Sequence, residues 1–187
     1  MKQKSLFFGF SLITSFCIAN AQESSNTSYS SSSDDERTVF FGVDLGIGSN
    51  SHWGVTSEGT VLNVNIRILW DFCPYLGWNT FGMNYFTYAD ESNLQLLTGL
   101  RAYTPRFLGN MCFFASFKLG VGFLFLFEEN YDTGSGFAYD FEAGFHFART
   151  FFIAYSYNHQ GGTIVSYKIR EFEMNCGRDL FRIGFNF

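Results

Sequence analysis

The chain has 187 residues, of which 21% are aromatic and only 16% are charged, and its formal net charge is −5. Soluble domains usually carry about 25% charged residues, so this composition predicts that much of the surface does not face water. The sequence has no run of about 18 apolar residues, so it does not support a transmembrane helix. It also has no basic run or stripe, which argues against nucleic acid as a partner.

The first 21 residues have the pattern of a secretory signal peptide. Lys2 and Lys4 supply a positive start, Leu6–Ile18 forms a short apolar core, and Ala19–Ala21 fits a small-residue cleavage site. A buried first helix is the alternative, and the Ser-rich stretch that follows directly disfavours it. We therefore expect residues 1–21 to be removed on export.

Residues 22–36 are polar, rich in Ser and of low complexity. Such a segment cannot bury enough apolar surface to fold, so its composition predicts a disordered linker. The remaining residues, 37–187, are long enough for one domain.

Apolar and polar residues alternate over eight segments of this domain. A period of two with one apolar face predicts β-strands. The expected strands are Val39–Gly48, Leu62–Trp70, Leu76–Tyr88, Leu94–Tyr103, Phe113–Phe125, Phe137–Phe147, Phe151–Asn158 and Phe181–Phe187. The third is the least regular; we expect Phe81, Met83 and Tyr85 on one face and Thr80, Gly82 and Asn84 on the other.

Alternation alone does not tell which row faces outward, because a soluble barrel of the lipocalin kind turns its apolar row inward. Three features favour a membrane barrel. The polar rows combine glycines with charges of both signs, and aromatic residues crowd the strand ends. Tight turns near Cys73-Pro74, Leu108–Asn110 and Ala148–Thr150 alternate with longer connections. We therefore predict an all-β fold, an eight-stranded antiparallel transmembrane up-and-down β-barrel.

The polar rows of the predicted barrel contain charges that would meet inside it. They are Asp44, Arg67, Arg101, Lys118, Asp140, Glu142 and Arg182. Eight strands enclose a space just wide enough for side chains, and buried charges must be paired. We therefore predict an ion-paired network that fills the lumen; a proton or solute path through it is the alternative. His146 belongs to the same row, as a hydrogen-bonding partner rather than a metal ligand.

The end of the chain carries a family resemblance. Leu180–Phe187 resembles the closing strand of bacterial outer-membrane proteins, which end in an aromatic residue that the barrel-insertion machinery reads. Glu142–Phe145 and Phe151–Tyr157 resemble the last hairpin of small outer-membrane barrels common in Bacteroidetes. The resemblance implies a Gram-negative outer membrane, contact with its lipids, and recognition of Phe187 by that machinery.

A second resemblance concerns a catalytic pattern. His159, with Glu173 downstream, is similar to the lipid A 3-O-deacylase barrels, in which a His, a Ser two residues later and a downstream Glu form a triad. Gly161 stands at the Ser position here. Without a hydroxyl nucleophile, acyl transfer has no starting group. A lipid A or phospholipid acyl hydrolase is therefore the second hypothesis for function, and a narrow pore is the third.

Three cysteines follow the predicted cleavage site, namely Cys73, Cys112 and Cys176. The export route is oxidising, so a Cys73–Cys112 disulfide stays open, although their turns are not neighbours in the strand order. The odd count leaves at least one free thiol. The sequence has no metal-ligand spacing and no phosphate-binding glycine loop, so we predict no metal and no cofactor.

The first hypothesis for function is a structural or surface-binding role, such as adhesion through extracellular loops. Acidic residues at Asp90-Glu91, Glu128-Glu129 and Asp132 suggest contact with cations or host molecules. The longest external loop is expected at 159–179, where residues 163–172 could extend the last two strands beyond the membrane. A protruding sheet edge can take up an extracellular ligand by strand addition.

Overall fold

Eight β-strands make up the described part of the chain. The computed structural model describes residues 39–53, 59–88, 91–108, 110–126, 133–147, 150–166 and 170–187. The predicted signal peptide and linker lie outside these residues. The strands are β1 Val39–Trp53, β2 Gly59–Cys73, β3 Leu76–Tyr88, β4 Glu91–Tyr103, β5 Met111–Leu126, β6 Thr133–Phe147, β7 Phe151–Ser166 and β8 Arg170–Asn186. No helix among these residues is long and apolar enough to cross a membrane.

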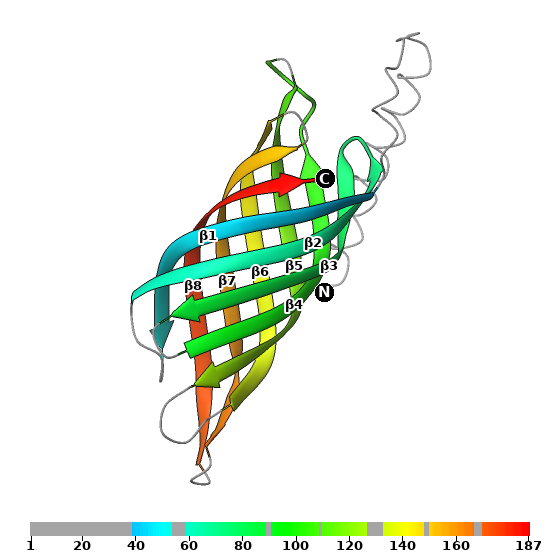
Figure 1. Cartoon of the computed structure of the whole chain (residues 1–187). Coiled ribbons are helices and arrows are strands. Elements are labelled where there is room, and N and C mark those ends of the chain that lie inside the picture. The colour runs from blue at the N-terminus through cyan, green and yellow to red at the C-terminus, as the bar shows by residue number, and fades with distance from the viewer. Residues whose placement is uncertain are drawn as a thin grey trace, which may run out of the picture. The chain divides into compact units, whose positions relative to one another are not determined.

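Each strand pairs antiparallel with the next, and β8 pairs with β1, so the sheet closes into a barrel (Figure 1). The seam is in register from Gly42 opposite Asn186 to Trp53 opposite Asn175. The backbones of Phe41 and Phe187 complete it, since each N–H donates to the carbonyl of the other, at 3.2 and 2.7 Å. The predicted eight-stranded up-and-down barrel is confirmed.

The apolar row of each strand faces outward. On β6, Phe137 and Phe141 are 56% and 51% exposed, whereas Asp140 and Glu142 on the alternate row are 0% and 2% exposed. The same holds for the other strands, on which large apolar side chains such as Leu45 remain exposed. This arrangement is the inverse of a soluble barrel, in which the apolar row would fill the interior, so the lipocalin-like alternative is wrong.

The two ends of the barrel differ. We call the end that holds the β2–β3, β4–β5 and β6–β7 connections the turn end, and the opposite end the loop end. The turn end carries an outward aromatic cluster, in which the ring of Phe72 lies 5.0 Å from that of Trp70 and 6.3 Å from that of Trp78. Toward the loop end, several outward rows carry exposed hydroxyl residues, namely Ser49, Thr60, Thr87, Thr133, Ser135 and Thr163.

Between these ends lies a continuous apolar band. On β6 it runs over ten residue steps from Phe137 to Phe147, which is about 33 Å of extended strand. For the strand tilt of about 40° that is usual in such barrels, this length gives a band about 25 Å tall, the height typical of a membrane barrel.

The strands are longer than alternation predicted, above all at the loop end. The expected strand ends at Asn158 and Phe181 are wrong, because β7 continues to Ser166 and β8 begins at Arg170. The expectation that residues 163–172 extend these two strands is confirmed in its described parts. Pairing stays in register through Gly161 opposite Asn175 and Thr163 opposite Glu173. Beyond the apolar band the outward face no longer needs apolar residues, so strand and loop look alike in the sequence.

The expected facing of Thr80 is also wrong. Asn79 is buried, and Thr80 and Phe81 are both exposed. A bulge causes this change, because the β3–β4 register shifts between Asn79 and Gly82. A two-residue period cannot continue through a bulge. Outward hydroxyls compensate for the interrupted ladder, since Thr98 donates to the Asn79 carbonyl at 2.9 Å.

Close approach of neighbouring strands depends on particular glycines. A Cβ at Gly120 on β5 would clash with the backbone carbonyl oxygen of Leu96 on β4. We predict that Gly120→Val lowers the free energy of unfolding by at least about 1–3 kcal/mol, because the Leu96 backbone cannot move away from the added side chain. A larger loss would prevent the barrel from closing. The measurement is the folded fraction in vesicles, read from heat-dependent electrophoretic mobility.

Ala115→Val is the matched control for this prediction. Ala115 is an exposed, outward residue of the same strand, so the added methyl groups meet no backbone. Equal folded fractions for the two variants would contradict the close-packing argument.

Candidate functional site

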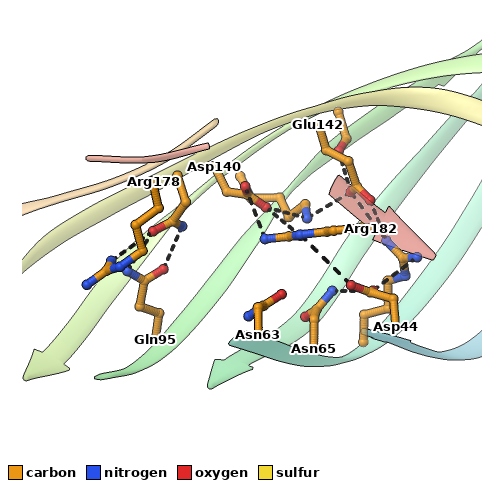
Figure 2. A network of polar contacts seen from close by, with 12 residues as sticks. Asp44, Asn63, Asn65, Gln95, Asp140, Glu142, Arg178 and Arg182 are labelled. Carbon is orange, nitrogen blue, oxygen red and sulfur yellow. Dashed lines mark hydrogen bonds and ion pairs between the residues drawn. The ribbon is translucent and has the colours of Figure 1, made fainter. Parts of the chain in front are cut away.

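The polar rows of six strands place seven charged side chains inside the barrel. They are Asp44 on β1, Arg67 on β2, Arg101 on β4, Lys118 on β5, Asp140 and Glu142 on β6, and Arg182 on β8. All seven are buried, and ion pairs join them into one network, part of which Figure 2 shows. The fold thus brings together the charged residues that the sequence places on the polar, inward rows of the strands.

Glu142 lies at the centre of this network. Its Oε1 accepts a hydrogen bond from Nη1 of Arg67 at 3.2 Å, and its Oε2 accepts one from Nη2 of Arg101 at 2.9 Å. The Nζ of Lys118 lies 2.9 Å from Oε2, and the Ser116 hydroxyl donates to it at 3.2 Å. Since β2 and β6 stand four strands apart in a ring of eight, the Arg67 contact spans the lumen.

The other two carboxylates bind the remaining cation of the network. Asp140 accepts hydrogen bonds from Lys118 at 2.6 Å and from Nη1 of Arg182 at 3.2 Å. Asp44 lies 3.9 Å from Nε of Arg182 and accepts a hydrogen bond from Nδ2 of Asn65 at 2.7 Å. Figure 2 shows Arg182 lying between these two carboxylates.

The network holds four cations against three carboxylates. Aromatic rings contact two of these cations. The Arg67 guanidinium lies 4.2 Å from the ring centroid of Phe152, and that of Arg101 lies 4.3 Å from the ring centroid of Phe114. A desolvated guanidinium over an aromatic face gains attraction from the ring quadrupole. Pairing on one side and aromatic contact on the other let these charges remain out of water.

An aromatic cluster closes the lumen at the turn end. The rings of Phe114 and Phe152 meet edge to face at 5.8 Å, and Ala154 packs with them. The His146 ring lies 4.7 Å from that of Phe114, and its Nε2 lies 3.4 Å from Nη1 of Arg101. Because arginine has only donors, Nε2 is the acceptor in this contact. His146 therefore takes part as a hydrogen-bonding partner.

A layer of amides follows the charged network toward the loop end. Gln95 and Asn158 exchange hydrogen bonds at 3.0 and 2.7 Å. Gln160 accepts from both Asn93 and Gln95, at 2.7 and 3.0 Å. These contacts join β4 to β7, so they cross the lumen as the ion pairs do. Arg178 donates to Asn158 at 3.2 Å, on the left in Figure 2.

A second apolar cluster lies at the loop end. Val61, Phe86 and Leu180 are buried together, and the Arg178 guanidinium lies 4.6 Å from the Phe86 ring centroid. The small cavity beside them has room for about one water molecule. It is lined by Asn50, Val61, Phe86, Glu91, Ser92, Asn93, Leu124 and Arg178. Of the acidic loop residues considered in the sequence, only Glu91 lies within the described ranges.

From the turn end to the loop end, the lumen therefore has three layers: an aromatic cluster, an ion-paired and amide layer, and an apolar cluster. Side chains from opposite strands meet across this space through ion pairs and amide hydrogen bonds. Such an interior rigidifies the barrel and gives no wide path for solutes.

Sequence reasoning missed several of these residues. Arg178 shares the inward parity of Leu180 and Arg182, so extending the last predicted strand by a few residues would have found it. Phe114 and Phe152 also lie on inward rows. The sequence does not show, however, that an aromatic residue on such a row will contact a guanidinium group.

The catalytic pattern considered in the sequence does not assemble. His159 lies opposite Gly177, whereas Glu173 lies opposite Thr163. The two residues are thus about four residue steps apart along the hairpin, roughly 13 Å. His159 stacks instead on the ring of Tyr139, with centroids 4.8 Å apart.

No disulfide joins any two of Cys73, Cys112 and Cys176. Cys112 and Cys176 are buried, and Cys73 is partly exposed. The disulfide left open between Cys73 and Cys112 is not formed. Within the described ranges, no group of three or more His, Cys, Asp or Glu side chains gathers in a way that could hold a metal ion.

Comparison with known proteins identifies the class by fold. No protein-family model matches the sequence, and no curated protein matches it either. The structure of Neisserial surface protein A matches with a TM-score of 0.56 at 9% identity, covering 81% of this chain and 98% of that one. The fold is thus that of small eight-stranded outer-membrane barrels.

Two further structures match less well. Ail, the attachment invasion locus protein of Yersinia pestis, solved with the heparin analogue sucrose octasulfate, has a TM-score of 0.48 at 12% identity, covering 81% of this chain and 100% of that one. The N-terminal barrel domain of Pseudomonas aeruginosa OprF has a TM-score of 0.43 at 14% identity, covering 78% and 97%. The resemblance to Bacteroidetes barrels stays a prediction.

The central carboxylate yields a stability prediction. Glu142→Gln leaves three buried cations without their shared partner, and removing one member of a buried pair costs about 3–5 kcal/mol. We expect a loss of that size in the free energy of unfolding, measured by urea titration of the protein in vesicles. Ser116→Ala, which removes one neutral donor to the same oxygen, should cost only about 1 kcal/mol.

A double variant tests the electrostatic cause. Lys118→Met added to Glu142→Gln removes one charge of each sign, so part of the lost stability should return. A double variant less stable than Glu142→Gln alone would show that packing, rather than charge pairing, carries the effect.

Proposed function

We propose that this chain is an integral protein of the bacterial outer membrane, in which a sealed, rigid barrel supports an extracellular binding surface. One observation carries the proposal: a closed barrel exposes a continuous apolar band while buried side chains fill its lumen. The turn end would face the periplasm, as short turns do in such barrels, and the loop end would face outward.

The apolar band supports residence in a membrane. An exposed apolar surface that encircles the whole barrel far exceeds the patches that soluble monomers show. A closed barrel satisfies every strand edge, which is the condition for crossing lipid with β-structure. The exposed Phe187 at the seam supports the further proposal that the barrel-insertion machinery reads the C-terminus.

The filled lumen argues against transport. The charged side chains pair across the interior from β2 to β6, and the amides pair from β4 to β7. A conducting path would require these pairs to break and water to enter a space closed by apolar clusters at both ends. The narrow pore is therefore the weaker hypothesis.

The loop end supports a binding role. β7 and β8 reach furthest there, as the lower part of Figure 1 shows, and they pair beyond the last β1–β8 pair at Trp53 and Asn175. Backbone groups of a strand that outruns its neighbour can pair with an extended segment of a partner. We propose that this hairpin extension contacts surface molecules outside the cell, as an adhesion protein would.

Ion conductance tests the sealed barrel. We expect the purified protein to insert into planar lipid bilayers without producing stepwise ion currents, while a large porin in the same bilayers does. Reproducible steps from the wild-type protein would refute the sealed lumen and restore the pore hypothesis.

A shortened hairpin tests the binding surface. Gly162 and Met174 are paired partners on β7 and β8, so an Asn-Gly turn can replace residues 163–173 and keep the register. Bacteria that carry the shortened protein should attach several-fold less to cultured host cells than bacteria with the wild type. Unchanged attachment at equal surface amounts would refute the proposed surface.

The control variant changes the opposite end. An Asn-Gly turn in place of Pro74 and Tyr75 alters the turn end, which would face the periplasm, and should leave attachment at the wild-type level. Heat-dependent electrophoretic mobility confirms that both variants are folded.

A further inference from the structure

Arg178 differs from the other buried cations of the lumen, because it has no carboxylate partner. The others lie 3.2 Å or less from a carboxylate oxygen, namely Arg67, Arg101, Lys118 and Arg182. Arg178 is only 3% exposed, yet within the described part of the chain it forms no ion pair. It donates to Asn158 and lies over the Phe86 ring, on the left of Figure 2 and away from Glu142. An unpaired charge out of water costs free energy, so folding alone gives no reason for a guanidinium here.

The Arg178 side chain lines the small cavity at the loop end. Asn50, its paired neighbour across the β1–β8 seam, lines the same cavity. The buried side chains of Val61, Phe86 and Leu124 supply apolar walls. Apolar walls keep water away, which strengthens an ion pair formed beside them. An anion that enters from the loop end would therefore meet a desolvated guanidinium.

A second lining residue has an unused hydrogen-bonding atom. Asn93 is 2% exposed, and its Nδ2 donates to Oε1 of Gln160 at 2.7 Å. Among the described residues, its Oδ1 has no donor. Buried acceptors without a donor are uncommon in folded proteins. The cavity thus presents a cation and an acceptor together, which suits a ligand that carries an anion beside an O–H group.

The size of the cavity limits what can enter it. It has room for about one water molecule, and therefore for one hydroxyl group of a ligand. The guanidinium is a planar fork of N–H donors that matches both oxygens of a carboxylate. Asn158 uses a donor on Nη1 only, so further donors remain for a carboxylate held at the mouth of the cavity.

We propose that Asn93 and Arg178 form a binding site for a ligand that carries a carboxylate next to a hydroxyl group, such as a 2-hydroxycarboxylate. The carboxylate would accept hydrogen bonds from Arg178. The hydroxyl would enter the cavity and donate to Oδ1 of Asn93. The inference rests on the outward placement of the loop end proposed above, and it goes beyond it by naming the chemistry of a ligand and the residues that hold it.

Glu91 opposes binding from the rim of the cavity. It lines the cavity, is partly exposed, and forms no ion pair with Arg178. Its carboxylate would repel that of the ligand. We therefore expect Glu91→Gln to tighten binding several-fold.

Saturation-transfer NMR on small acids measures this binding. The mature protein is placed in lipid nanodiscs, which leave both ends of the barrel accessible, and is titrated with glycolate, acetate or glycolamide. We expect glycolate to bind about fivefold more tightly than acetate, as one neutral hydrogen bond can supply. Glycolamide, which has no charge, should give no saturable signal. Arg178→Met should abolish glycolate binding, and Asn93→Ala should reduce the preference over acetate to less than about twofold.

Unfolding in urea separates a binding residue from a structural one. Arg182, on the same inward row of β8, is paired with Asp140, so Arg182→Met should lower the urea midpoint. Arg178→Met removes an unpaired buried charge, so without ligand the midpoint should stay equal or rise. A fall as large as that of Arg182→Met would overturn the site, because Arg178 would then be required for folding.

Failure of this site and failure of the proposed adhesion surface are distinguishable. The variant with the shortened β7–β8 hairpin keeps Asn93 and Arg178, so it should bind glycolate as the wild type does even though its attachment to cells falls. A folded wild-type protein that gives no saturable glycolate signal would overturn this inference and leave the outer-membrane placement intact. Equal affinities for glycolate and glycolamide would also overturn it, because the guanidinium would then have no part in binding.

Discussion

Charge pairing across the lumen is the constraint on which this barrel depends. A closed sheet in lipid must turn its apolar rows outward, so its polar rows have nowhere to lie except inside. Eight strands leave too little space for a water column, and charged groups inside must satisfy each other. Glu142 meets this requirement for three cations at once, from β2, β4 and β5.

The same constraint explains the composition of the two ends. Aromatic residues under Arg67 and Arg101 at the turn end, and the ring of Phe86 under Arg178 at the loop end, hold cations where carboxylates are scarce. These rings also exclude water from the ion pairs, which strengthens them. A barrel filled in this way is a rigid support, and activity then belongs to surfaces rather than to the lumen.

The loop end is where the requirements on the chain change. Within the apolar band the outward row must be apolar, and above it the row turns to hydroxyls, His159 and Asp179. Tyr155 spans the boundary with its ring among apolar neighbours and its hydroxyl on Asp179. The outward surface therefore changes from apolar to polar at the outer limit of the apolar band and stays polar in the β7–β8 hairpin beyond it.

The sequence by itself determined the number of strands, their order and the face of almost every residue in the apolar band, because a period of two is imposed wherever one face meets lipid and the other a packed interior. It selected Asp44, Glu142 and their partners by parity alone. It failed at Thr80, where a bulge breaks the period, and at the ends of β7 and β8, where no lipid enforces alternation. Only the tertiary structure decided which charges meet. Contacts such as that of Arg67 with Glu142 depend on the register of every strand pair and on closure of the whole barrel. The alternation along one strand carries no information about the strand on the opposite side of the lumen.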